Sequence, residues 1–251
     1  MHTHQEKLLQ LFLRLAPIEG VPRGERRIAD EVLRILRSAG VRAIEDDTAG
    51  KIDGDTGNLF CLPESFDANA PSVLLSAHLD TVQSTSSLSV RVTDDRVTSD
   101  GTTILGADNR MGLAVLVDLL LSIAHSKNTF KNFFVVFTVC EERGLKGANT
   151  LDLSVYPVLA AYVFDCSRRP GVYIREAVGL SVFTAEFVGK AAHAGIAPEE
   201  GVSAIALCSN SISKLQLGRI DPETTVNIGT IHGGEAFNIV PERVKIEGEI
   251  R

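Results

Sequence analysis

The sequence predicts an α/β fold, with a mostly parallel sheet and flanking helices, followed by a smaller α+β layer. Three apolar runs, at 72–77, 132–140 and 158–165, are typical of strands buried on both faces of a parallel sheet. A helical pattern over 110–125 separates the first two runs, which is the order expected of a βαβ unit. After about residue 178 the pattern changes to alternating strands around one helix, which indicates a second layer.

The chain ahead of the first apolar run is predicted to supply helices and a strand pair. An amphipathic helix is expected over 5–15, and a second helix from about Pro22 to Ser38. Residues 41–60 have the glycine and aspartate turns of a strand or hairpin, and 58–62 is a plausible strand.

Another hairpin is expected over 84–103, between the first run and the central helix. In the second layer, strands are predicted over 180–189, 224–234 and 238–251, with a helix over 201–215. This β-α-β-β order is typical of an α+β layer with its helix on one face, and we interpret it as an inserted lid.

The composition argues against several classes of protein. A net charge of −7, with no basic cluster and few aromatic residues, argues against nucleic-acid binding. The longest membrane-span candidate, 112–124, is interrupted by Asp118, and the N-terminal segment lacks the apolar core of a signal peptide. Four cysteines without CxxC spacing predict reduced thiols in a cytoplasmic protein, with Cys140 and Cys166 filling the core.

Acidic residues or a histidine stand at separate segment ends of the predicted α/β unit. Strand ends line the ligand crevice of an open α/β sheet, so these side chains are expected to meet. Each has a simpler interpretation when taken singly, such as a helix N-cap for Asp108 or a solvated turn for Glu141 and Glu142. Taken together they favour a dinuclear metal site. The residues are His78 with Asp80, Asp108, Glu141 with Glu142, and Asp165.

This set of side chains predicts hydrolytic chemistry. Zinc and its neighbours accept histidine nitrogen and carboxylate oxygen, and a catalytic site keeps one position open for water. Two metals, about 3.5–4 Å apart, lower the pKa of a shared water, and a carboxylate must then take its proton. One of two adjacent glutamates can bind metal while the other serves as the base. The predicted reaction is hydrolysis of an amide or related bond.

An ordered set of motifs resembles the M20 metallopeptidases, and within them the peptidase T branch of aminopeptidases. The resemblance covers nearly the whole chain, although the segment EERGLKGA is also similar to M42 aminopeptidases. It implies a zinc-peptidase-like catalytic domain over 1–178 and a lid or dimerisation domain over 179–251. The motifs are AHLDTV (77–82), GADNRMG (106–112), CEERGLKGA (140–148), FDC (164–166), GKAAHAG (189–195) and GGEAFNIVP (233–241).

The resemblance also implies a set of metal ligands. His78 and Asp165 would bind one metal, Glu142 would bind the other, and Asp108 would bridge both. Asp80 would orient His78 through its carboxylate. The cofactors implied are two divalent metal ions, zinc first, with manganese or cobalt as alternatives.

The remaining roles that the resemblance implies concern the substrate. Glu141 would be the general base, and His193 would stabilise the tetrahedral oxyanion, supplied by the partner subunit in dimeric relatives. Asn238 and Arg251 would contact the substrate, because a guanidinium can bind a peptide carboxylate bidentately. The partners expected are a short peptide and a second copy of the chain joined through the lid, with no nucleic acid and no membrane.

The leading hypothesis is an aminopeptidase that cleaves the N-terminal residue from short peptides through a metal-activated water. The alternatives are an M20 amidohydrolase that deacylates N-acyl amino acids, or an inactive truncated binding module. The resemblance to the M20 family implies a longer chain, which continues past the position of Arg251 and supplies a final histidine to the second metal. We therefore expect a C-terminally truncated form, with an incomplete lid, an uncovered sheet edge and a weak second metal site.

Overall fold

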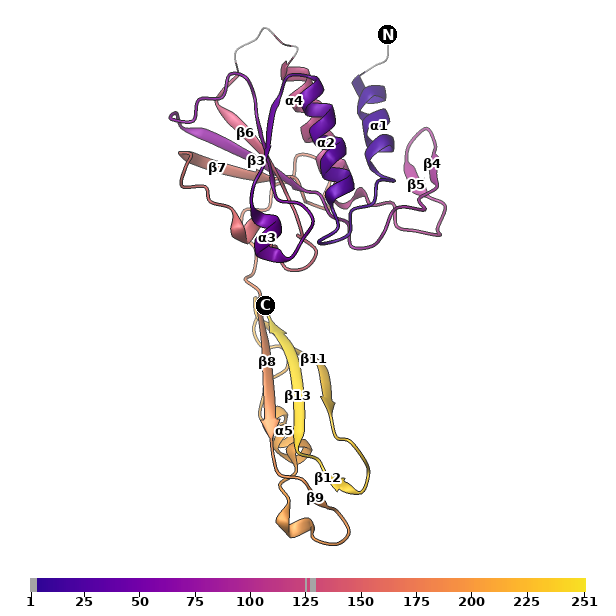
Figure 1. Cartoon of the computed structure of the whole chain (residues 1–251), viewed down its shortest axis with the longest axis vertical. Helices are drawn as coiled ribbons and strands as arrows, with labels where there is room; N and C mark the ends of the chain where they lie inside the picture. Colours follow the sequence, from indigo (N-terminus) through magenta and orange to yellow (C-terminus); the bar gives the residue numbers. More distant parts are fainter. Residues whose placement is uncertain (1–3, 125, 127–129) are drawn as a thin grey trace. The chain divides into compact units, whose positions relative to one another are not determined.

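The computed structural model describes residues 4–124, 126 and 130–251, which form two compact units (Figure 1). The first unit extends to Gly171, and the second runs from Val172 to Arg251. A five-stranded sheet organises the first unit, and a four-stranded sheet organises the second.

The sheet of the first unit has the strand order β1-β2-β6-β3-β7. Strand β3 (Ser72–His78) lies between β6 (Phe133–Thr138) and β7 (Val158–Val163) and pairs with both in parallel. The edge pair of β1 (Arg42–Glu45) and β2 (Leu59–Leu62) is antiparallel, and β2 joins β6 antiparallel. The α/β class is confirmed, with the three predicted apolar runs as the parallel strands.

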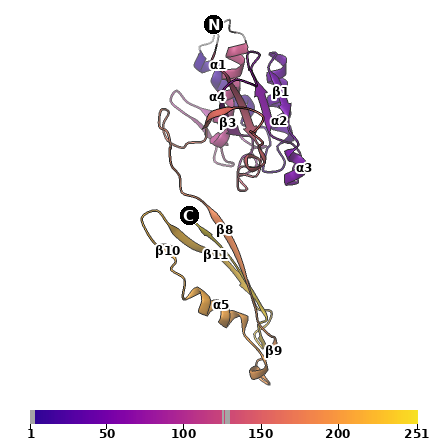
Figure 2. The same cartoon turned by 90° about the vertical axis from the view of Figure 1, so that its left-hand side faces the viewer.

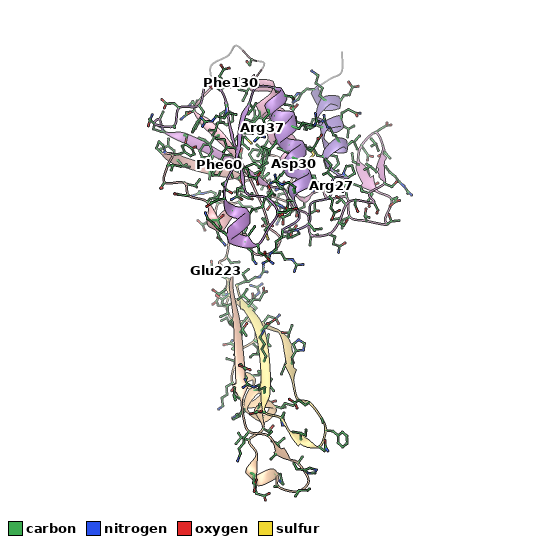
Figure 3. The ribbon with its side chains drawn as sticks, viewed as in Figure 1. Arg27, Asp30, Arg37, Phe60, Phe130 and Glu223 are labelled. Atoms are coloured by element: carbon green, nitrogen blue, oxygen red, sulfur yellow. The ribbon has the colours of Figure 1, made fainter. Side chains whose placement is uncertain are left out.

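Three helices, α1 (His4–Leu15), α2 (Arg26–Ser38) and α4 (Ala107–Ala124), lie together on one side of this sheet (Figures 1 and 2). Residue 125, the predicted last residue of the central helix, lies outside the described residues. The outward side of α2 is polar and carries Arg27, Asp30 and Arg37 (Figure 3). Its opposite side is apolar and buried, as expected of an amphipathic helix at a sheet surface.

The period-2 alternation of β6 divides the apolar core between the two faces of the sheet. Val135 and Phe137 belong to the cluster that includes the three helices, whereas Phe134 and Val136 belong to a second cluster on the other face. The edge strand β7 is less covered, and its Leu159 is 75% exposed. The chain is therefore best packed around β3 and β6, the strands that carry the predicted site.

The second unit has the strand order β10-β11-β13-β8, and its pairs are antiparallel. One helix packs on this sheet through Ala204 and Cys208, which meet Val244 and Ile246 (Figure 2). The predicted β-α-β-β order is confirmed. Its elements are β8 (Ser181–Val188), α5 (Ala204–Ile212), β10 (Gly218–Arg219), β11 (Thr225–Gly233) and β13 (Arg243–Ile250), with a small pair β9 (Ala192–His193) and β12 (Ile239–Val240) and a 3-10 turn η2 (Pro198–Glu200).

Shorter elements complete the first unit. The predicted hairpin forms from β4 (Val90–Val92) and β5 (Val97–Ser99). A five-residue helix α3 (Thr48–Ile52) and a 3-10 turn η1 (Ala148–Thr150) were not predicted from the sequence. No helix among the described residues combines the length and apolar character needed to cross a bilayer.

Two local predictions are wrong. Helix α2 begins at Arg26 rather than Pro22, because the Gly24 amide donates to the Val21 carbonyl (2.8 Å) and closes a turn there. Cys166 is exposed rather than buried in the core, because β7 ends at Val163 and strand alternation no longer applies three residues further on.

Candidate metal centre

The imidazole of His78, the last residue of β3, is the centre of a cluster of carboxylates. Its Nε2 lies 3.1 Å from Asp108 Oδ1, 3.8 Å from Asp165 Oδ1 and 3.9 Å from Glu141 Oε2. Ligand atoms of His78, Asp108 and Asp165 lie within 4.8 Å of one another, and so do those of His78, Glu141 and Glu142. The structure thus brings together the side chains that the sequence places at separate segment ends.

The parallel strands position these residues. The Leu79 amide donates to the Thr138 carbonyl (2.8 Å), and the Phe164 amide donates to the Ser76 carbonyl (2.7 Å). These bonds continue the sheet by one residue beyond β3 and β7, and so bring the chain after the parallel strands to one edge. Asp108 reaches the same edge at the start of α4, where it has non-helical φ and ψ and a cis peptide bond to Asn109.

Asp80 lies behind the imidazole and is completely buried. Its Oδ1 is 3.3 Å from His78 Nδ1, a nitrogen without another partner among the described residues. The two carboxylate oxygens accept the amides of Glu141 and Glu142, each at 3.0 Å. One buried carboxylate therefore faces the predicted metal-binding histidine and also holds the backbone of both glutamates.

Mutual repulsion and burial control the protonation of this cluster. Burial raises the pKa of Glu141, Glu142 and Asp108, and neighbouring carboxylates raise it further. Burial lowers the pKa of His78, but Asp165 and Asp80 outweigh it and raise the pKa to about 10. Burial raises the pKa of Asp80, but hydrogen bonds from His78 and from two backbone amides leave it below its usual value.

The donor set fits divalent metal ions. Among the described residues, no lysine or arginine forms an ion pair with Asp108, Glu141, Glu142 or Asp165, so their repulsion is opposed by one imidazole. Histidine nitrogen with carboxylate oxygens is a set that zinc and manganese accept, and both glutamates are half-buried rather than sealed in the core. A bound cation would relieve the repulsion that raises these pKa values.

The other three predicted site residues belong to the second unit. His193 lies in β9, is exposed, and accepts the Gly195 amide at Nδ1 (3.2 Å). The Asn238 carbonyl accepts the Ala194 amide (3.0 Å), which ties the His193 loop to the segment before β12. Arg251 is exposed and donates from Nε to Glu249 (3.1 Å).

Two buried charged residues next to the cluster were missed by the sequence reasoning. Glu25 and Arg110 are both completely buried. Glu25 lies within the predicted helix from about Pro22, and Arg110 lies at the start of the predicted central helix, where charged side chains are usually solvated. The position of Arg110 within the motif GADNRMG was a signal that could have singled it out.

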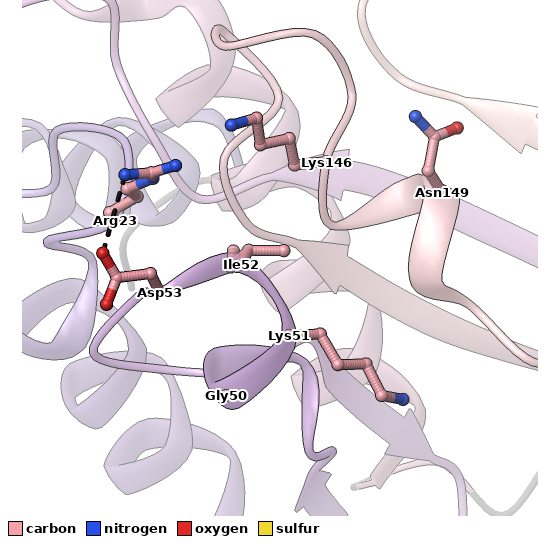
Figure 4. A pocket seen from close by; sticks show the side chains of 7 residues that line it. All are labelled: Arg23, Gly50, Lys51, Ile52, Asp53, Lys146 and Asn149. Carbon is pink, nitrogen blue, oxygen red and sulfur yellow. Dashed lines mark ion pairs between the residues drawn. The ribbon is translucent and has the colours of Figure 1, made fainter.

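A depression of about 440 Å³ lies on the first unit, lined by residues other than those of the cluster (Figure 4). Arg23 and Asp53 form an ion pair across it at 3.8 Å. Lys51, which also lines it, is already held by Asp47 at 2.6 Å. None of the residues that line the depression belongs to the cluster around His78, which is the candidate metal centre.

Family models match the two units separately. A model of the M20 peptidase dimerisation domain matches residues 175–251, and a model of the M42 glutamyl aminopeptidases matches residues 88–171. The M42 match includes the segment EERGLKGA, whose similarity to that family is visible in the sequence.

Relatives match along the whole chain. The uncharacterised protein YqjE of Bacillus subtilis (strain 168) is 36% identical over 249 residues, covering 99% of this chain and 67% of the relative. A tripeptidase structure from Staphylococcus aureus subsp. aureus Mu50 superimposes with a TM-score of 0.87 at 35% identity, covering 100% of this chain and 67% of that one. The aminopeptidase PepT of Bacillus cereus ATCC 10987 gives 0.80 at 36% identity, covering 98% and 66%.

The fold and the site define a peptidase-like α/β unit joined to a peptidase dimerisation domain. The chain belongs to the M20 metallopeptidase family, in its peptidase T-like branch. It spans about two thirds of the length of these three relatives.

Proposed function

We propose that the chain carries the metal centre of an aminopeptidase that removes the N-terminal residue from short peptides. The observation that carries the proposal is the approach of His78 Nε2 to the carboxylates of Asp108, Asp165 and Glu141 within 3.9 Å. Relatives named tripeptidase and aminopeptidase at 35% and 36% identity support the choice of peptide over other amide substrates.

In this proposal the cluster divides into ligands and a base. His78 and Asp165 would hold one divalent metal ion, Glu142 would hold the other, and Asp108 would contribute to both. The ions, zinc first among zinc, manganese and cobalt, supply Lewis-acid activation of a water when they are bound. Asp80 fixes the imidazole so that Nε2 faces the ligands, a common role for a carboxylate behind a metal-binding histidine.

Glu141 is the proposed general base. Its carboxylate takes the proton of the attacking water and then donates it to the leaving amine. Burial raises the pKa of Glu141 above the usual value, which brings its basicity closer to that needed near neutral pH. The Asp80 bond to its amide, 3.0 Å long, fixes the backbone from which the base is presented.

The second unit is the proposed lid and dimerisation domain, with the catalytic domain over 1–178 and the lid over 179–251. The match of residues 175–251 to a peptidase dimerisation domain supports this role. His193 would stabilise the oxyanion, from the partner subunit in a homodimer, and Asn238 and Arg251 would contact the substrate. We also propose a cytoplasmic location, supported by four cysteines that are all free.

A substrate panel tests the proposed reaction. The 251-residue chain, loaded with Zn²⁺, Mn²⁺ or Co²⁺, is assayed on free-amine tripeptides and on N-acyl amino acids. We expect turnover of the tripeptides, and a loss of at least about 10³-fold in kcat for Glu141→Gln with metal binding retained. Preference for N-acyl amino acids, absence of turnover in the metal-loaded chain, or full activity of Glu141→Gln would each contradict the proposal.

A further inference from the structure

The turn that follows β6 is held by two buried carboxylates that come from different parts of the chain. The Cys140 amide donates to Glu25 Oε1 (2.8 Å), while the amides of Glu141 and Glu142 donate to Asp80 (3.0 Å each). The three consecutive amides of residues 140–142 are thus held directly after β6. This is the segment that carries the proposed base, Glu141, and the proposed metal ligand Glu142. Asp80 has a role in the proposed function, but Glu25 has none.

Glu25 is not explained by the helix that it precedes. It occupies the N-cap position of α2, but its side chain makes no capping hydrogen bond to that helix. The carboxylate instead faces the Cys140 amide, and its Oε2 has no hydrogen-bond partner among the described residues. Burial raises the pKa of Glu25 to about 7, so a charge at this position destabilises the fold. A buried carboxyl that does not cap its helix is therefore expected to serve another purpose.

The residue that Glu25 holds has an unfavourable backbone conformation. Cys140 has φ +52, in the left-handed region that residues with a Cβ rarely adopt. Its carbonyl accepts the Lys146 amide (3.1 Å), which closes the turn from the other side. Cys140 therefore connects the buried strand β6 to the turn that carries both glutamates.

The buried guanidinium of Arg110 offsets part of the negative charge of Glu25 and Asp80. The guanidinium of Arg110 donates to the carbonyls of Leu79 and Ile18, the latter at 3.0 Å. Burial lowers the pKa of Arg110 to about 10, and Asp80 and Glu25 are among the acids that oppose this. Arg110 thus acts on both carboxylates through its charge, while the hydrogen bonds of its guanidinium in the described part of the chain go to backbone carbonyls.

We propose that Glu25 is a positioning residue, which holds the Cys140 amide and thereby fixes the direction in which Glu141 and Glu142 are presented to the metal centre. The link from Glu25 to the metal rests on the proposed function. The link from Glu25 to the turn rests on the hydrogen bonds alone. The two links can be tested separately, one on the metal-free chain and one with a probe ion.

The experiment compares Glu25→Ala, Glu25→Gln and the control Leu36→Ala in the 251-residue chain. Alanine removes the acceptor, whereas glutamine has the same size and keeps an oxygen for the Cys140 amide. Leu36 is buried in α2 and does not contact the turn by any hydrogen bond, so its truncation controls for loss of stability near Glu25.

The first readout is amide exchange in the metal-free chain, followed by NMR at single residues. Glu25→Ala should speed exchange of the Cys140 amide relative to that of Leu79, which is bonded within the sheet. Glu25→Gln should restore the wild-type ratio, and Leu36→Ala should leave it unchanged. Equal ratios in Glu25→Ala and Leu36→Ala would overturn the positioning role.

The second readout is the affinity for Co²⁺ together with its visible absorption spectrum. Glu25→Ala should weaken Co²⁺ binding by about 10-fold to 100-fold and change the spectrum, as loss of outer contacts at metal sites does. Glu25→Gln should stay close to wild type. An unchanged affinity and spectrum in Glu25→Ala would overturn the link to the metal centre. Absence of Co²⁺ binding in the wild-type chain would instead refute the proposed function. The amide-exchange result would then still show whether Glu25 holds the Cys140 amide.

Discussion

Replacing Asp80 with asparagine changes the hydrogen bonding of the turn after β6 with almost no change in shape. Both carboxylate oxygens accept backbone amides, from Glu141 and Glu142, and the side chain is completely buried. Asparagine has one oxygen and one NH₂ group, so one of the two amides would face another donor. The Asp80 side chain has no exposed surface, so in the folded state water does not contact it directly to replace the lost bond.

The expected loss of stability follows from those two bonds. A hydrogen bond to a charged group contributes about 1.5–3 kcal/mol, and a buried donor without a partner costs about 1–3 kcal/mol. Asp80→Asn removes one of the two hydrogen bonds, and the remaining bond has a neutral acceptor instead of a charged one. We therefore expect a decrease of about 2–4 kcal/mol in the free energy of unfolding.

The effect should depend on pH in a defined direction. Burial raises the pKa of Asp80, but the bonds from His78 and the two amides outweigh it, and the pKa is lowered. A lowered pKa in the folded state means that the carboxylate contributes its full stability above the usual value of 3.8. That contribution is lost as the pH falls further through the folded-state pKa, so the difference between wild type and variant should shrink in acid.

Urea unfolding at pH 7.5 with a chelator, read by pulse hydrogen exchange on peptides from β3 and β6, measures the first unit alone. The chelator removes any contribution from bound metal. Asp152→Asn is the control, because this exposed carboxylate also accepts a backbone amide, from Ser154 (2.9 Å), and its replacement should leave the urea midpoint close to that of the wild type. A midpoint for Asp80→Asn equal to that of the control would refute the reasoning.

Further predictions concern three other positions. Gly147→Ala should destabilise the first unit by about 1–3 kcal/mol in the same urea series, because its Cβ would lie 2.2 Å from the Val139 carbonyl oxygen. Co²⁺ binding should release about one proton and tighten up to about tenfold per pH unit between pH 6 and 8. The reason is that His78, with a pKa of about 10, must lose its proton; calorimetry in two buffers measures this. Glu25→Gln should gain stability relative to wild type between about pH 4.5 and 7, by up to about 3 kcal/mol. The wild-type carboxyl, with its pKa raised by burial to about 7, loses stability as it ionises across that range, as urea unfolding against pH would show.

Each of these outcomes can fail separately. An unchanged midpoint for Gly147→Ala would mean that the turn can move away from the new methyl group. Co²⁺ binding without proton release would mean that His78 is already neutral. A constant difference between Glu25→Gln and wild type across pH would mean that Glu25 is ionised as easily as an exposed carboxyl.

Local pattern was enough to predict the strands and much of the site. Buried parallel strands appear as apolar runs, and the residue after such a run lies at the sheet edge. The strand ends therefore predict that His78 and Glu141 lie near each other although they are far apart in the sequence, and in the structure their side chains approach to 3.9 Å.

The features that sequence reasoning missed depend on contacts between distant segments. From its neighbours in the sequence, Glu25 is expected to be an ordinary acidic residue at the start of a helix. The residue whose amide it accepts, Cys140, lies 115 residues further along the chain. Arg110 donates to backbone carbonyls in two other segments, and the hydrophobic periodicity of a helix gives no information about such contacts. Helix α3 is too short, at five residues, for a periodic pattern to reveal it.

The most direct test of the account is a Co²⁺ titration of the metal-free chain, comparing wild type with His78→Gln and with His232→Gln. His232 is an exposed histidine in the second unit and controls for adventitious binding. The account predicts a saturable visible spectrum in wild type and in His232→Gln, and its loss in His78→Gln. Wild-type binding no stronger than that of His78→Gln would contradict the assignment of the cluster as a metal centre.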